Sequence, residues 1–170
     1  MVLVDHGRAM EFSFEDVLKY HGHGSPGGAA VGFKALERAL PLLDPDAPCE
    51  RREITIATAF GGPGARDAFE LLTRAVTGGR FEVDPSLARP ELGRARERFV
   101  FRFGYRGTSV TLLLREGFVT GEFIDLARTE GRSAAAETRL DTLKFELASR
   151  VLAQPAEAVF DLTGAEKEQP

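Results

Sequence analysis

The 170-residue sequence is poor in sulfur, histidine and tryptophan: it has one cysteine, two methionines, three histidines and no tryptophan. A single cysteine excludes an intramolecular disulfide bond, and it excludes a metal site made of thiolates alone. Cys49 stands between Pro48 and Glu50, in a turn rich in proline and aspartate. We therefore interpret Cys49 as an incidental thiol.

The chain also lacks long runs of one kind of residue. No stretch approaches the roughly 20 apolar residues that a membrane helix needs, and no basic segment followed by an apolar run stands at its beginning. Lysine and arginine form no run, and the formal net charge is −4. Nucleic-acid binding usually leaves a basic footprint, so we expect no nucleic-acid partner. Because no membrane helix is predicted either, we expect a cytoplasmic protein without a membrane partner.

Apolar residues, by contrast, are plentiful. They make up 43% of the chain and include 13 phenylalanines, which is enough for the core of one domain of this length. We expect that domain to cover residues 1–163. The segment 164–170 is polar and without periodicity, so we expect a disordered tail there.

The spacing of the apolar residues predicts both helices and strands. Helices are predicted over 14–20, 26–43, 65–76 and 133–153, and strands over 53–60, from residue 80, over 117–124, and as a hairpin over 99–114. This order indicates an α+β fold, with helices packed on an antiparallel or mixed sheet and a long C-terminal helix. Phe145 and Leu152 lie outside the main apolar stripe of that helix, which favours a second apolar face and a homodimer.

The turn before the second predicted helix holds two of the three histidines, His21 and His23. Pro26 is typical of a first helical position, which makes Ser25 the N-cap, with its hydroxyl accepting from the first turn. Histidines in such a turn are suited to binding a metal or to moving protons. The spacing does not choose between these two roles.

A second glycine-rich turn, Gly61-Gly62-Pro63-Gly64, follows a predicted strand and again leads into a helix. Helix N-termini present free N–H groups and a partial positive charge, so Gly27, Gly28, Gly61 and Gly62 are candidate contacts for a phosphate or a carboxylate. We expect the two turns to converge on one pocket. The alternative is that the glycines serve tight turning, and no Gly-Lys-Ser or Gly-Lys-Thr ending indicates a nucleotide P-loop.

Two of these residues also have purely structural interpretations. Phe14, Val17, Leu18 and His21 recur at helical spacing, so His21 is expected to close the core stripe of the first helix unless it has a function. Ser25 is expected to be a cap rather than a nucleophile, because no Gly-x-Ser-x-Gly elbow surrounds it.

The stretch His21-Gly22-His23-Gly24-Ser25-Pro26-Gly27 resembles the signature of the FmdE family of formylmethanofuran dehydrogenase components, in which His-Gly-His runs into Cys-Pro-Gly at the head of a helix. The strand 54–60, together with the turn and the Asp67-Ala68 pair after it, resembles the second motif of that family. The segment 149–160 looks like its closing pattern. The likeness spans roughly residues 12–162.

The FmdE resemblance implies an α+β domain, often dimeric, whose motif residues line a pocket associated with a metal, usually taken to be zinc. It also implies a partnership with a molybdenum or tungsten oxidoreductase complex. The three thiols of the family are absent, because Ser25, the Phe60/Gly61 position and Gly79 stand in their places.

The resemblance makes His21, His23 and Asp67 the expected metal ligands. Zinc takes about four ligands, and without the thiols this set needs further oxygen donors. Glu122 and Asp125 are candidates for that role. The alternative for each of these carboxylates, Asp67 included, is a solvated or capping position.

Three functions follow from these observations. The first is a binding or accessory protein of the FmdE kind, whose histidine pocket holds a metal or a small ligand without turnover. The second is a small enzyme in which His23 is a general base or a ligand of a catalytic metal, and Ser25 helps to stabilise an anion. The third is a metal-free scaffold or dimeric interaction protein.

Overall fold

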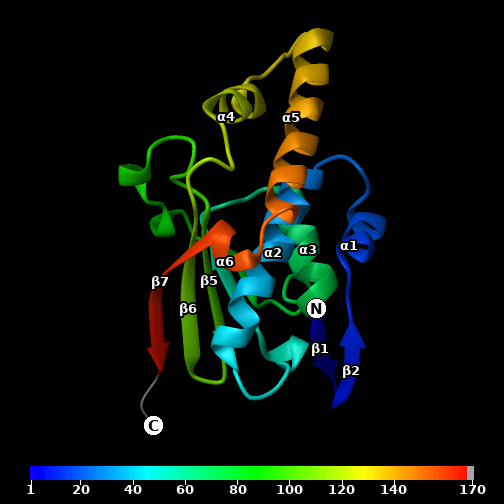
Figure 1. The fold of residues 1–170 in the computed structure, drawn as a ribbon, viewed down its shortest axis with the longest axis vertical. Coiled ribbons are helices and arrows are strands. Elements are labelled where there is room, and N and C mark those ends of the chain that lie inside the picture. The colour runs from blue at the N-terminus through cyan, green and yellow to red at the C-terminus, as the bar shows by residue number, and fades with distance from the viewer. Residues whose placement is uncertain (168–170) are drawn as a thin grey trace.

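A mixed sheet of five strands, in the order β4-β3-β5-β6-β7, forms the middle of the computed structural model, which describes residues 1–167 (Figure 1). β3 (Thr55–Thr58) and β4 (Phe81–Val83) are parallel, whereas the other neighbouring strands are antiparallel. The remaining strands are β5 (Val100–Tyr105), β6 (Thr108–Leu114) and β7 (Phe160–Lys167). The α+β class predicted from the sequence is confirmed.

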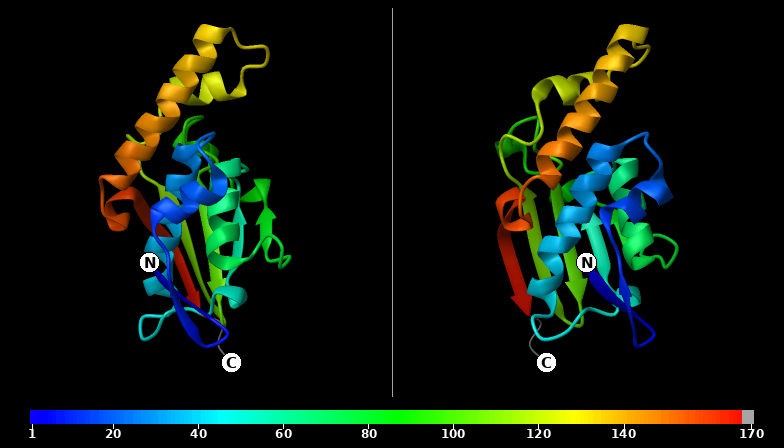
Figure 2. Two further views of the ribbon diagram at one scale, coloured as in Figure 1. Left: turned by 90° about the vertical axis from the view of Figure 1, so that its right-hand side faces the viewer. Right: turned by 45° about the vertical axis from the view of Figure 1, so that its right-hand side comes forward.

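Helices cover one face of this sheet. α2 (Pro26–Leu43) packs against β5 and β6, and α3 (Pro63–Thr73) lies beside α2 (Figure 2). α5 (Ala134–Leu152) crosses α2 and projects beyond the end of the sheet, where α4 (Gly121–Arg128) packs against it (Figures 1 and 2). The short α6 (Ala156–Val159) leads from α5 into β7. The predicted long C-terminal helix is therefore confirmed.

The core lies between the helices and the covered face of the sheet. Along β5, Phe101 and Phe103 are buried, whereas Arg102 between them is exposed. Phe69 of α3 meets both of these rings edge-on, at centroid distances of 6.1 and 5.7 Å. The alternation along β5 follows from the two-residue period of a strand, which turns successive side chains to opposite faces.

Local signals determine where the first two helices begin. α1 (Phe14–His21) starts at a capping box, in which the Asp16 N–H donates to Ser13 Oγ and the Ser13 N–H donates to the Asp16 carboxylate at 2.9 Å. Pro26 occupies the start of α2, as predicted. Ser25 is the N-cap residue of α2, but its side chain makes no capping hydrogen bond. The capping role predicted for the Ser25 hydroxyl is therefore wrong.

The helices α2 and α3 approach each other closely because the facing residues are small. A Cβ atom on Gly64 of α3 would lie 2.5 Å from the backbone nitrogen of Ala29 in α2. On the other side of α2, a Cβ atom on Gly27 would lie 2.9 Å from the carbonyl oxygen of Lys144 in α5. Close packing of backbones therefore requires glycine at both positions.

The loop from β4 to β5 spans residues 84–99. It contains two 3-10 turns, η2 (Pro85–Leu87) and η3 (Pro90–Leu92), and then runs through residues 94–98 into β5. Another 3-10 turn, η1 (Arg51–Glu53), precedes β3. Arg94 and Arg98 of this loop line the same cavity as residues of α4 and α5, which is described below.

Three segments differ from the sequence prediction. Residues 117–124, predicted as a strand, contain the start of α4, whose N-cap Thr120 accepts a hydrogen bond from the Phe123 N–H. Residues 164–167, predicted as part of a disordered tail, form the end of β7 and pair with β6. Residues 168–170 lie outside the described part of the chain. The hairpin of β1 (Val2–Asp5) and β2 (Arg8–Glu11) has no counterpart in the prediction.

The outer surface of α5 bears on the homodimer prediction. Phe145 is 50% exposed, whereas Leu152 is partly buried and packs against the core. The second apolar face predicted for this helix therefore reduces to Phe145, and the homodimer stays a prediction. Within residues 1–167, no helix has both the length and the apolar character needed to cross a membrane.

Candidate functional site

His21 and Asp67 form a pair between two helices. His21 is the last residue of α1, and Asp67 lies in the second turn of α3. Nδ1 of His21 and Oδ2 of Asp67 are 2.8 Å apart, and the two side chains are 8% and 27% exposed. Two of the three residues expected as metal ligands therefore lie in direct contact.

This contact defines the hydrogen-bonding state of the imidazole. A carboxylate only accepts hydrogen bonds, so the proton lies on Nδ1 of His21 and a neutral ring has its lone pair at Nε2. Nε2 is buried and has no hydrogen-bond partner among residues 1–167. Carboxylate–histidine pairs of this kind leave the second nitrogen available to bind a metal or to take up a proton.

The donor set for a metal is nevertheless incomplete. His23 lies beyond α1 in an exposed turn, the Glu122 carboxylate pairs with Arg139, and Asp125 is near Arg94. In the described part of the chain, no three side chains of His, Cys, Asp or Glu gather where they could hold a metal ion. Because zinc sites use at least three protein ligands, these residues do not fit the zinc site that the resemblance implies.

The lone cysteine lies elsewhere. Cys49 is 1% exposed, and its Sγ atom is 3.9 Å from the carbonyl oxygen of Leu40 in α2. Burial raises the pKa of the Cys49 thiol to about 11. The group is therefore a neutral thiol at pH 7, unlike the thiolates that bind metals or attack substrates.

The heads of α2 and α3 border a cavity of about 470 Å³, which we call the head cavity. Its wall includes Gly24 and Ser25 from the first glycine-rich turn, and Gly61 and Gly62 from the second. The larger apolar side chains of the wall come from the β3–α3 turn, the residue before β5, α4 and α5: Phe60, Phe99, Phe123, Ile124 and Leu140. The two turns thus converge on one pocket.

The other two glycines of the predicted site have a packing role. Gly27 and Gly28 are buried and do not line the head cavity. Gly27 packs against α5, as described above, and a Cβ atom on Gly28 would lie 3.2 Å from Ser25 Oγ. The space beside both residues is filled by protein atoms, which explains why side chains are missing there.

The basic residues of the head cavity were not predicted from the sequence. Its wall includes four arginines and one lysine: Arg94, Arg98, Arg128, Arg132 and Lys144. They come from the loop before β5, from α4, from the turn after α4 and from α5. The one sequence signal is the concentration of arginine between residues 89 and 98, a segment that also suits a solvated loop.

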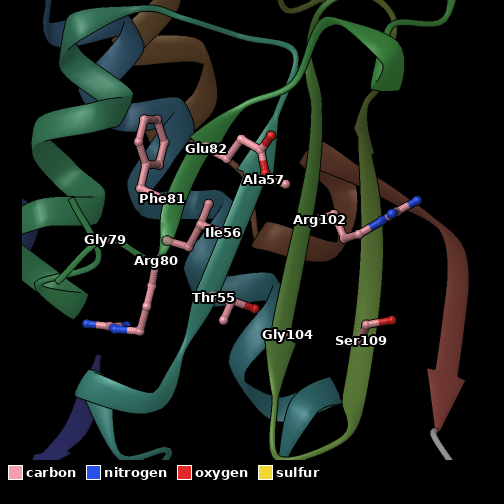
Figure 3. Close-up of a pocket in the computed structure, with 10 residues that line it drawn as sticks. All are labelled: Thr55, Ile56, Ala57, Gly79, Arg80, Phe81, Glu82, Arg102, Gly104 and Ser109. Atoms are coloured by element: carbon pink, nitrogen blue, oxygen red, sulfur yellow. The ribbon is translucent and has the colours of Figure 1, made fainter.

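A second hollow of about 350 Å³ lies on the sheet beside β4 (Figure 3). The guanidinium group of Arg80 there donates to the carbonyl oxygens of Thr73 and Arg74, at 3.1 and 2.9 Å. The Arg102 side chain extends over β6 toward β7 (Figure 3). Among the described residues, no histidine and no member of either glycine-rich turn lines this hollow. We therefore assign the candidate site to the head cavity.

No family model and no curated protein matches this chain. The molecule is an α+β protein with a cavity at the heads of two helices. His21, His23 and Asp67 are not among the residues that line this cavity. The resemblance to the FmdE family rests on the motif residues alone.

Proposed function

We propose that this protein binds a small molecule in the head cavity, as a binding or accessory protein of the kind that the FmdE resemblance implies. One observation carries the proposal: two glycine-rich turns, distant in sequence, line the same cavity at the heads of α2 and α3. Ligand cavities of proteins commonly measure roughly 300–1,000 Å³. The head cavity, at about 470 Å³, falls within this range.

The composition of the wall supports the same proposal. The rings of Phe60 and Phe99 are stacked, with centroids 4.3 Å apart. Phe123 and Ile124 of α4 and Leu140 of α5 add further apolar surface. An apolar wall with a few polar groups is the usual form of a small-molecule site, because the wall desolvates the ligand and the polar groups orient it.

The proposal can be tested with the uncharged fluorescent dye N-phenyl-1-naphthylamine. We expect a saturable fluorescence increase with one dye per chain. Ala127 of α4 lines the head cavity, so the variant Ala127→Trp should reduce the volume and weaken dye binding at least about tenfold. Ala135 of α5 is exposed and does not line the cavity, so Ala135→Trp is the matched control.

Two outcomes would overturn the proposal. One is the absence of saturable dye binding to the folded protein, which would favour the scaffold function. The other is dye binding that Ala127→Trp and Ala135→Trp leave equally intact. Circular dichroism of each variant would establish that the fold is unchanged.

The buried His21 Nε2 atom favours a second candidate function, which is proton-transfer catalysis. With Asp67 accepting from Nδ1, Nε2 is the nitrogen that would take a proton from a substrate. The test is nuclear magnetic resonance of protein labelled with ¹⁵N in its histidines. A change of the His21 Nε2 resonance on dye binding would show that a bound molecule reaches the imidazole, which this function requires, whereas an unchanged resonance would contradict it.

A further inference from the structure

The charge of the head cavity is one-sided. Among the described residues that line it, five are basic and none is acidic, although the chain as a whole has a formal net charge of −4. A concave wall with charges of one sign raises the local concentration of ligands with the opposite sign. The cavity is therefore suited to an anion.

Most of these basic groups have carboxylate neighbours that lie outside the cavity wall. The N–O distances are 3.3 Å for Arg94–Asp125, 3.0 Å for Arg128–Glu97, 2.8 Å for Arg132–Glu137 and 2.9 Å for Lys144–Asp141. The carboxylates of Asp125 and Asp141 are each 61% exposed. Exposed ion pairs contribute little in water, and each guanidinium group has five N–H donors. Arg132 also donates to the carbonyl oxygens of Leu126 and Thr129, so the pairs of Arg94, Arg128 and Lys144 leave the most donors available to a ligand.

Arg98 differs from the other four basic residues. Within residues 1–167 its guanidinium has no carboxylate at ion-pair distance, and the neighbouring Glu97 pairs with Arg128 instead. Arg98 immediately precedes Phe99, whose ring belongs to the apolar wall. An available guanidinium thus borders the surface on which an apolar ligand would rest.

We infer that the head cavity takes an organic anion, with a carboxylate or phosphate group near Arg98 and an apolar body against the phenylalanine rings. The inference rests on the proposed function, because it names the class of ligand for the same cavity. The heads of α2 and α3 favour the same charge, since neither helix has a side-chain cap on its first N–H groups. Arg98 is the residue that selects the anion.

A pair of dyes tests this inference. The dye 8-anilinonaphthalene-1-sulfonate has the ring system of N-phenyl-1-naphthylamine and one added sulfonate group. We expect Arg98→Ala to weaken binding of the sulfonate dye about tenfold, as the loss of a charge-assisted hydrogen bond would, and to change binding of the neutral dye less than about twofold. Arg102→Ala removes an exposed arginine on β5, outside the head cavity, and should change neither affinity.

The failure of this inference is distinguishable from the failure of the proposed function. If Arg98→Ala leaves binding of the sulfonate dye unchanged, or weakens both dyes equally, the anion inference is overturned while binding of the neutral dye still supports the proposed function. If neither dye binds, or Ala127→Trp leaves neutral-dye binding intact, the proposed function fails as well.

Competition experiments distinguish the two possible anionic groups. Octanoate, octyl phosphate and uncharged octanol have the same apolar chain, and each would be used to displace the sulfonate dye. Displacement by octanoate would assign a carboxylate ligand, and displacement by octyl phosphate alone would assign a phosphate ligand. Equal displacement by octanol would overturn the inference, because the charge would then contribute nothing.

Discussion

Nδ1 of His21 lies 2.8 Å from Oδ2 of Asp67, which joins the last residue of α1 to the second turn of α3. The contact holds the imidazole in one orientation. It also ties the turn before α2 to the helix that begins with the second glycine-rich turn.

Asp67→Ala should destabilise the protein by about 1–3 kcal/mol, because the buried Nδ1 of His21 loses its acceptor. Asp141→Ala is a suitable control: the Asp141 carboxylate is 61% exposed and pairs with Lys144 three residues away, so a change of less than about 0.5 kcal/mol is expected. Urea unfolding measures both values. Equal losses in the two variants would contradict the structural importance of the pair.

The two N-cap serines should differ in their contributions to stability. Ser13→Ala removes the two hydrogen bonds that the Ser13 hydroxyl makes with Asp16, one of which is the capping bond from the Asp16 N–H, and should cost about 1 kcal/mol. Ser25→Ala removes a hydroxyl that caps nothing, so the change in the free energy of unfolding should stay within a few tenths of a kcal/mol. Thermal unfolding of both variants provides the comparison. A larger loss for Ser25→Ala would show that this hydroxyl caps α2 in solution.

Gly64→Ala tests the close approach of α2 and α3. The new Cβ atom would overlap the Ser25 carbonyl oxygen and lie 2.5 Å from the Ala29 nitrogen, and neither backbone atom can move freely. We expect a loss of at least about 2 kcal/mol. Gly24→Ala is the control, since a Cβ atom there meets nothing within 4 Å. A Gly64→Ala variant as stable as Gly24→Ala would contradict the packing described for these helices.

Glu70 should make stability depend on pH under acidic conditions. Burial acts to raise the pKa of this carboxyl, but hydrogen bonds from the Thr77 N–H, the Thr77 hydroxyl and Arg74 outweigh it, so the pKa lies below the ordinary value of 4.5. A lowered pKa in the folded state means that the stabilisation is complete above the ordinary pKa and is lost as the pH falls through the folded-state value.

The variant Glu70→Gln should therefore lose about 1–3 kcal/mol at pH 7, where the charged hydrogen-bond acceptor is missing. Its stability should also fall less steeply than that of the original chain as the pH drops below about 4.5, because one titrating group is gone. Urea unfolding at several pH values measures this slope. Parallel acid limbs for the two proteins would show that Glu70 is not responsible.

The zinc content of the purified protein tests whether its side chains provide too few ligands to hold zinc. We expect protein purified without a polyhistidine tag to contain well below one zinc ion per chain, because among residues 1–167 only His21 Nε2 is an available buried imidazole nitrogen. His21→Ala should leave the content unchanged. Elemental analysis of both samples makes the comparison. Near-stoichiometric zinc that the variant loses would establish a metal site without thiols.

Short-range patterns in the sequence were sufficient for much of the secondary structure. The alternation of Phe101, Arg102 and Phe103 predicts the buried face of β5, because strand geometry turns neighbouring side chains to opposite faces. The start of α1 is predicted by Ser13 together with Asp16, and the start of α2 is predicted by Pro26. Both signals are local, because N-terminal capping involves residues only a few positions apart. The sequence also indicates that both glycine-rich turns precede helices, whereas their meeting at one cavity depends on how α2 and α3 pack.

Tertiary structure decided what local patterns leave open. The end of β7 is a strand because it pairs with β6, about fifty residues earlier in the chain, and the apolar residues 117–124 belong partly to a helix because α5 covers one side of α4. The head cavity has the same origin. Arg98, Phe123 and Lys144 lie on separate elements and meet the two turns only after folding, and no local periodicity records such contacts between distant segments.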